Sequence, residues 1–139
     1  MIKHSFGKCL GLFLCLSLAV AIFSPRAAHA QENITLEINA FHRAVPKNSA
    51  TKIIFGKKTD NAPRIQGLTG TPVGVDNSDK IKVYEKNGHY YVLSEDDSKI
   101  AFPEKSIALF QNYEQLKTVD FADAVDTSKV EVLNNLFYN

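Results

Sequence analysis

Residues 109–139, LFQNYEQLKTVDFADAVDTSKVEVLNNLFYN, decide the expected fold of this chain. The stretch begins with LFQN (residues 109–112) and ends with LFYN (residues 136–139), two quartets that match at three of four positions. They lie 27 residues apart, which is within the period of solenoid repeats. Between the quartets, three apolar residues have the spacing of a repeat strand whose side chains enter a shared core: Leu116, Val119 and Phe121. We therefore interpret the stretch as a repeat.

The end of this stretch predicts a short helix with a wide apolar face. Ser128 and Glu131 fit a capping box, in which the serine oxygen accepts an early backbone N–H and the glutamate reaches back to the serine N–H. At about 100° per residue, the apolar side chains of this helix fill an arc of about 160°. Another short helix is expected over residues 107–113. The candidate binding surface is an apolar face of four residues: Val132, Leu133, Leu136 and Phe137.

A known repeat unit has the same signature residues. Asp126-Thr127-Ser128, Val130 and Phe137 stand at signature positions of the BspA-like leucine-rich repeats of bacterial surface proteins, which this stretch resembles. The unit of that family pairs a short leucine-rich strand with a DTS-x-V-x-x-M-x-x-M-F segment. Leucines of similar volume and apolarity replace the usual methionines at Leu133 and Leu136. The preceding YYVLSEDDSKIAFPEKSIALF is similar to the β-rich lead that often precedes such repeats.

The resemblance implies a secreted or surface-exposed bacterial protein-binding module that is adhesin-like and non-catalytic, with a protein partner or a host or cell-surface ligand. A single solenoid unit cannot bury its apolar face alone, because about three or more are normally needed. Three outcomes therefore stay open for the terminal face. The chain is a truncated or inert fragment of a longer repeat surface protein, or the helix folds back on the β-rich region, or another chain covers it. If the chain ends here, we expect self-association through this face.

Residues 1–30 have the parts of a secretory signal peptide. Two lysines precede an uncharged, leucine-rich run of 15 residues, 9–23. This run matches an h-region of about 7–15 residues and is shorter than the roughly 20 apolar residues of a membrane span. Ala28 and Ala30 supply the small residues of a cleavage site, and we expect cleavage after Ala30. The processed chain is then secreted, extracellular or at the cell surface, with no membrane span and no cysteine.

The part of the chain before the repeat is rich in strand signals. Residues 34–38 and 52–55 have strand-like patterns, and residues 59–79 read as a long irregular connection. The strongest local signal is a hairpin over residues 80–94, where Asn87-Gly88 supplies the positive-φ pair that a type I′ turn requires. The predicted fold class is α+β, with a β-rich N-terminal region containing a hairpin and then a single incomplete leucine-rich-repeat-like unit. The expected boundaries are 31–104 and 105–139.

The two-residue turn also predicts the register of the hairpin. It pairs Lys86 with His89 and Tyr84 with Tyr91, so the two tyrosines lie together on one face of the sheet. Tyr84 and Tyr91 are therefore a candidate aromatic pair for ligand binding. Half-buried sheet packing is the competing interpretation.

Composition argues against several other functions. After residue 30 the chain has 13 basic and 15 acidic residues without basic clusters, so we expect no binding to nucleic acid. It has no HExxH or GxSxG motif and no cysteine nucleophile, and its two histidines, His42 and His89, lack metal-site spacing. The paired acids Asp96 and Asp97 read as a solvated turn. We therefore expect no catalytic residue, metal or cofactor, and a small secreted enzyme is the less favoured alternative.

Overall fold

The computed structural model describes residues 33–106, 108–131 and 136–137, which belong to one compact unit, Glu32–Asn139. The expected signal peptide and its cleavage site lie outside the described residues. The regions expected before and after residue 104 are joined in this single unit.

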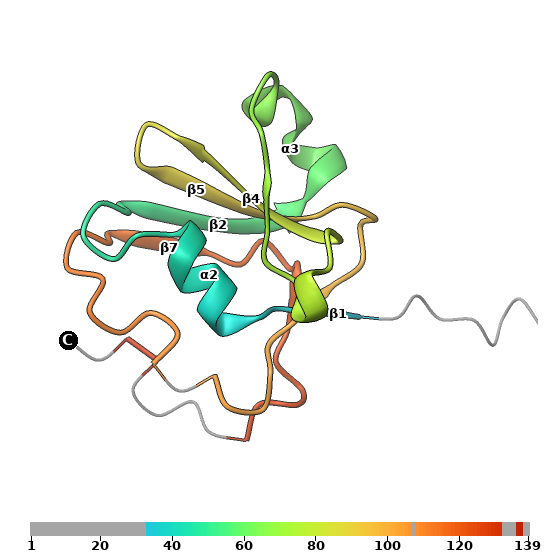
Figure 1. Cartoon of the computed structure of the whole chain (residues 1–139), viewed down its shortest axis with the longest axis vertical. Helices are drawn as coiled ribbons and strands as arrows, with labels where there is room; N and C mark the ends of the chain where they lie inside the picture. Colours follow the sequence, from blue (N-terminus) through green and yellow to red (C-terminus); the bar gives the residue numbers. More distant parts are fainter. Residues whose placement is uncertain (1–32, 107, 132–135, 138–139) are drawn as a thin grey trace, which may run out of the picture. The chain divides into compact units, whose positions relative to one another are not determined.

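The described chain is α+β, as predicted, with two helices and with sheets of five and three strands. The five-stranded sheet has the order β3-β4-β5-β2-β7, and the three-stranded sheet has the order β1-β6-β8. Helices α2 and α3 lie on opposite faces of the five-stranded sheet (Figure 1). In chain order the elements are β1 (Ile34–Thr35), α2 (Ile38–Ala44), β2 (Lys52–Lys57), α3 (Lys58–Ile65), β3 (Thr71–Pro72), the short turn η1 (Val75–Asn77), β4 (Ile81–Lys86), β5 (His89–Ser94), β6 (Ile100–Ala101), β7 (Thr118–Asp120) and β8 (Val125–Asp126).

Three segments of the chain stack through parallel strand pairs. Ile34 pairs with Ile100 and Lys52 pairs with Thr118, so both pairs join residues that are 66 positions apart. Strands β6 and β8 pair in the same parallel sense, at an offset of 25 positions. We name the segments coil 1 (residues 34–54), coil 2 (residues 100–120) and coil 3 (residues 125–137, of which 132–135 lie outside the described residues).

The loops of neighbouring coils are also in contact. The Tyr113 hydroxyl of coil 2 donates a hydrogen bond to the Val45 carbonyl of coil 1 (2.8 Å). The Phe110 N–H of coil 2 donates to the Leu136 carbonyl of coil 3 (2.9 Å). Coil 2 is therefore bonded to its neighbours through its loops as well as through its strands.

The chain between coils 1 and 2 packs against the side of coil 1 that faces away from coil 2. Strand β5 pairs with β2 on the edge opposite β7. Leu36, just after β1, forms an antiparallel bridge with Gly74, and the Glu37 N–H donates to the Val73 carbonyl (2.8 Å). At the other end of the stack, β7 and β8 are the last strands of their sheets among the described residues.

An aromatic core joins the coils. Phe41 of α2, Phe55 of β2 and Phe110 of coil 2 are buried, with ring centroids 6.1–6.3 Å apart. Buried aromatic side chains remove much apolar area from water, and tilted or edge-to-face ring contacts add to that stabilisation. Because residues 31–139 contain no cysteine, this packing stabilises the unit without disulfides.

A pH-dependent prediction concerns His42, whose ring joins coils 1 and 2. Its Nε2–H donates to the Leu109 carbonyl (2.9 Å). Burial lowers the pKa of His42 below its ordinary value, because desolvation disfavours the charged imidazolium. The unfolded chain therefore binds a proton more readily than the folded chain, and we expect the free energy of unfolding to fall as the pH drops below about 6.5.

Urea denaturation at about pH 7.5 and about pH 5.5 measures this fall. His42→Gln is the control, because glutamine does not titrate and its side-chain amide can still donate to Leu109. An equal fall in the variant would show that other groups cause the pH dependence.

The structure confirms the hairpin and its register. Tyr84 pairs with Tyr91 and Lys86 pairs with His89. Asn87 and Gly88 have φ values of 55° and 79°, as a type I′ turn requires. A short strand near Val119 was also predicted, and β7 confirms it.

Two helices contradict the sequence-based prediction. The alternating pattern of residues 34–38 predicted a strand, which β1 confirms at Ile34–Thr35. However, α2 begins at Ile38, because the Glu37 carboxylate accepts hydrogen bonds from the N–H groups of Asn39 and Ala40 (2.9 and 2.6 Å). The prediction of an irregular connection over residues 59–79 is wrong where α3 lies. Asn61 of α3 is buried, and its Nδ2 donates to the Lys57 carbonyl (2.9 Å). Each helix therefore has a side chain that is hydrogen-bonded to backbone groups near its N-terminus.

The short helix expected over residues 107–113 is also not found in the described residues, and the helix expected after Ser128 lies largely outside them. Residues 108–112 form turns, in which Ala108 and Asn112 have positive φ values of 67° and 63° that interrupt a right-handed helix. Ser128 begins a turn, and its N–H donates to the Asp126 carboxylate (2.9 Å), so the predicted capping box is not formed. This hydrogen bond also lowers the pKa of Asp126.

Candidate functional site

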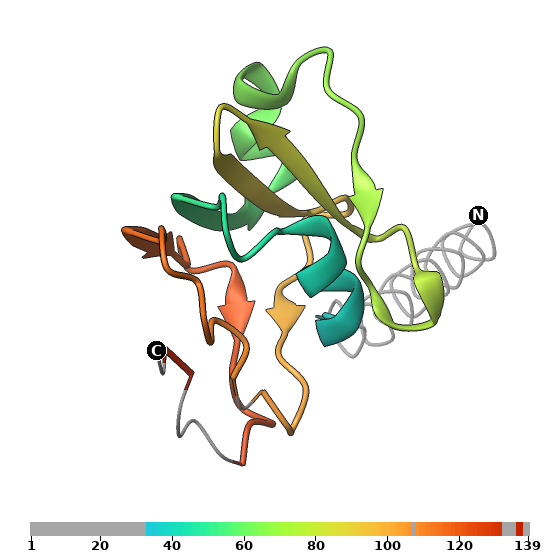
Figure 2. The ribbon, with the colours of Figure 1, turned by 60° about the vertical axis from the view of Figure 1, so that its left-hand side comes forward.

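The end of the stack formed by coils 2 and 3 is the first candidate site. Its two edge strands, β7 and β8, each have one partner strand among the described residues. Figure 2 shows β6 and β8 side by side with the same direction. Phe121 and Phe137 are 36% and 54% exposed. We name this surface the open end and define it by six apolar residues: Leu116, Val119, Phe121, Val125, Leu136 and Phe137.

Two hollows lie in the open end. A pocket of about 190 Å³ is lined by five residues: Leu116, Lys117, Thr118, Val119 and Phe137. A pocket of about 340 Å³ is lined by Phe102, Phe121, Val125, Thr127 and Leu136. Both linings are largely apolar, so this surface can bind an apolar side chain of a partner more readily than a charged ligand.

Stacked aromatic rings position the two exposed phenylalanines. The Phe137 ring lies on Phe110, with centroids 5.1 Å apart and planes 13° apart. The Phe121 ring lies on Phe55, with centroids 5.6 Å apart and planes 22° apart. Each exposed ring therefore covers a buried ring of the core with one face and leaves atoms open to solvent.

The predicted apolar face is only partly placed by the structure. Leu136 is half-buried against the core and Phe137 is exposed beside it, whereas Val132 and Leu133 lie outside the described residues. Phe121 and Val125 belong to the same surface but were not among the predicted site residues. Sequence reasoning assigned Phe121 to a buried repeat strand and did not detect β8, because a two-residue strand has no periodicity to recognise.

The other predicted site residues, Tyr84 and Tyr91, are neighbours in the sheet but lie beneath α3. They are only 5% and 7% exposed and pack with Ile65 and Leu93 in a second small core. The Tyr84 hydroxyl donates to Glu95 Oε1 (2.5 Å). Burial raises the pKa of Tyr84 above its ordinary value. The two tyrosines are therefore packed within the protein, and little of their surface is open to a ligand.

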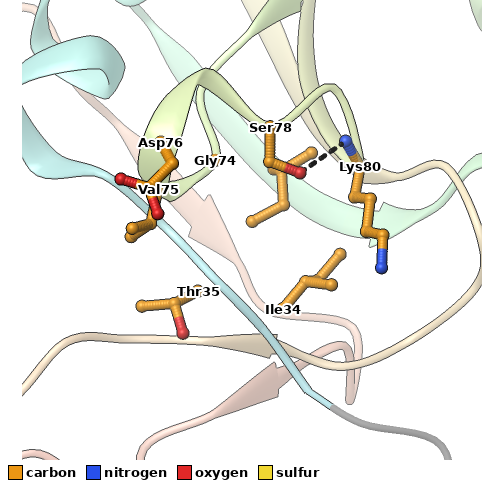
Figure 3. A pocket seen from close by; sticks show the side chains of 8 residues that line it. Ile34, Thr35, Gly74, Val75, Asp76, Ser78 and Lys80 are labelled. Carbon is orange, nitrogen blue, oxygen red and sulfur yellow. Dashed lines mark hydrogen bonds between the residues drawn. The ribbon is translucent and has the colours of Figure 1, made fainter.

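A third hollow, of about 380 Å³, lies beside β1 and is shown in Figure 3. Asp76 and Lys80 lie on opposite sides of it, and both side chains are exposed. Asp76 and Asn77 both have φ of 57°, a left-handed conformation that Asp and Asn tolerate better than most residues. The remaining lining is Ile34, Thr35, Gly74, Val75, Ser78 and Ile81. The hollow therefore lies between a tight polar turn and the edge strand β1.

The histidines and acidic residues considered for catalysis are dispersed. The ring of His42 is held by Leu109, and His89 lies on β5. Within residues 33–106, 108–131 and 136–137, no three His, Cys, Asp or Glu side chains gather as a metal site would require. In the same described ranges, no helix has the length and hydropathy needed to cross a bilayer.

Comparison of the sequence with protein-family models, with curated proteins and with solved structures finds no match.

Proposed function

We propose that this chain is a secreted or surface-exposed bacterial protein-binding module, adhesin-like and non-catalytic, whose binding surface is the open end. The observation that carries the proposal is that one end of the stack has two strands with a single partner each in the described part of the chain, beside two exposed phenylalanines, Phe121 and Phe137. We further propose that coils 2 and 3 are a BspA-like leucine-rich-repeat unit and that the preceding β-rich chain serves as its N-terminal cap.

The repeat interpretation is supported by how the two matching quartets lie in space. Residues of LFQN and LFYN meet across coils 2 and 3, where the Phe110 N–H donates to the Leu136 carbonyl (2.9 Å) and the Phe137 ring stacks on the Phe110 ring. Such contact between equivalent positions is the arrangement expected of stacked repeats.

The open end offers two kinds of contact that proteins use in recognition. An edge strand presents unpaired backbone N–H and C=O groups, to which a partner can add a strand. Exposed apolar side chains beside that strand lose their contact with water when the partner covers them. Coil 2 binds coil 1 by this same combination of parallel strand pairing and aromatic packing. A protein partner with a free strand and an apolar side chain therefore fits the open end.

Binding of the immobilised protein to matrix proteins, to host cells and to itself tests the proposal. We expect at least one of these probes to bind and Phe137→Asp to weaken that binding at least about 10-fold, because a charge is then buried in the contact. Phe121→Ser tests the other exposed ring. Circular dichroism and thermal unfolding show whether each variant is still folded.

Val75→Asp is the matched control, since Val75 is 41% exposed and lies beside β1, at the opposite edge of the three-stranded sheet from β8. We expect it to leave binding unchanged. Equal loss in Val75→Asp and Phe137→Asp, or no binding to any probe, would argue against a binding role for the open end.

Two other occupants of the open end have a basis in its geometry. A second copy of the chain would give self-association, which a compact monomer at all concentrations in sedimentation, with no binding of a hydrophobic dye, would refute. A further repeat of a longer surface protein would dock as coil 3 docks on coil 2, and this chain would then be a fragment without separate activity. The coding sequence that follows Asn139 distinguishes this case, because it would continue the repeat pattern.

A further inference from the structure

Basic side chains of three neighbouring strands lie on one face of the five-stranded sheet. Lys86 of β4 pairs with His89 of β5, and His89 pairs with Lys52 of β2. Directly paired residues on neighbouring strands point to the same face, with Cβ atoms about 4.5–5.5 Å apart. The three side chains therefore form a row across three strands.

A fourth basic side chain joins this row from α3. Arg64 stands in the last turn of the helix and lines, with residues of the hairpin, a pocket of about 300 Å³. The full lining is Arg64, Lys86, Asn87, His89 and Tyr91, and it contains no acidic residue. We name Lys52, Arg64, Lys86 and His89 the basic cradle.

The basic cradle has no acidic partner in the described part of the chain. Neither lysine and neither ring nitrogen of His89 forms an ion pair there, and Arg64 donates only to the amide oxygen of Asn61 (3.0 Å). The nearest acidic residue of this face in the strand register is Asp120, which pairs with Ile54 in the next row. A bound anion would supply the acidic partner that these cations lack within the described residues.

We propose that the basic cradle binds the sulfate or carboxylate group of an acidic polysaccharide. The guanidinium of Arg64 can hold such a group through two parallel N–H donors, and Lys86 adds a positive charge beside it. The amide of Asn87 and the imidazole of His89 are donors and acceptors for neighbouring sugar hydroxyls. Nucleic acid fits less well, because it requires a longer track of cations that neutralises several phosphates. This site is separate from the open end and does not depend on the function proposed for it.

Isothermal titration of the purified protein tests the inference with five probes: a heparin octasaccharide, an oligomer of galacturonic acid, a neutral oligosaccharide of equal length, sodium sulfate and a short single-stranded DNA. We expect the two acidic saccharides to bind, the neutral saccharide not to bind, and affinity to fall as salt rises. Tighter binding of DNA than of either acidic saccharide overturns the assignment to polysaccharide. Binding of free sulfate as tight as that of the octasaccharide overturns recognition of the sugar.

Substitutions separate the basic cradle from the general charge of the protein. We expect Arg64→Ala and Lys86→Ala each to weaken saccharide binding about 10-fold. Arg64→Lys keeps the charge but loses the paired donors, and we expect a smaller loss. Arg43→Ala is the matched control, because Arg43 is also exposed in the last turn of its helix, α2. Equal weakening by Arg43→Ala and Arg64→Ala overturns the proposal.

Discussion

Replacement of Phe55 by alanine is expected to lower the free energy of unfolding by about 3–5 kcal/mol, a large part of the roughly 5–15 kcal/mol of an ordinary domain. Phe55 is fully buried, and its ring lies 5.4–6.3 Å from the rings of four other phenylalanines. The substitution would leave a cavity among all of them. The neighbouring rings are Phe41, Phe102, Phe110 and Phe121.

Thermal unfolding measures this loss as a decrease of roughly 15 °C or more in Tm. Phe137→Ala is the control, because this ring is stacked on the same core but is 54% exposed. We expect it to cost about 1 kcal/mol or less. Similar losses in both variants would mean that the aromatic core is not the centre of stability.

Tyr113→Phe is expected to have the second largest effect on stability. The Tyr113 ring is buried, and its hydroxyl donates to the Val45 carbonyl, which is also buried (2.8 Å). Phenylalanine removes the donor and leaves that carbonyl unsatisfied, which costs about 1–3 kcal/mol. Urea denaturation at neutral pH measures the difference. A variant as stable as the wild type would show that this bond does not hold coils 1 and 2 together.

Burial of Tyr113 is also expected to make the free energy of unfolding fall at alkaline pH. Burial raises the pKa of Tyr113 far above its ordinary value, because the phenolate would lose its hydration. The stabilisation is complete below the ordinary tyrosine pKa of about 10 and is lost as the pH rises above it, since the unfolded chain then releases a proton that the folded chain retains. We expect roughly 1 kcal/mol of loss for each pH unit above about 10. In Tyr113→Phe this part of the loss should be absent.

Local chemistry was sufficient to predict part of the fold. The Asn87-Gly88 turn specified the hairpin and its register, because the backbone of a type I′ turn leaves one way to pair the flanking residues. The apolar spacing around Val119 predicted β7. Both features depend on residues that are close together in the sequence, so the sequence alone is enough to predict them.

Other features depend on partners that are distant in the sequence. The helix α2 is held in the core by Phe41, which packs against Phe55 and Phe110. No pattern in the sequence reveals the offset of 66 positions between coils 1 and 2. Residues 108–112 have helical spacing but form turns, in which Ala108 and Asn112 have positive φ values. In this loop the Leu109 carbonyl accepts a hydrogen bond from His42 of coil 1, a partner that is distant in the sequence.

The sequence by itself determined the α+β class, the hairpin with its register, and the spacing between LFQN and LFYN. Each of these features depends on residues that are adjacent in the sequence or recur at a regular spacing. Tertiary structure alone decided which surfaces remain available. In the folded chain, α3 covers Tyr84 and Tyr91, whereas Phe121 and Phe137 are exposed at the open end. The basic cradle is assembled from residues of β2, β4, β5 and α3. Exposure and charge clustering are properties of contacts between distant residues, and these contacts exist only after the chain has folded.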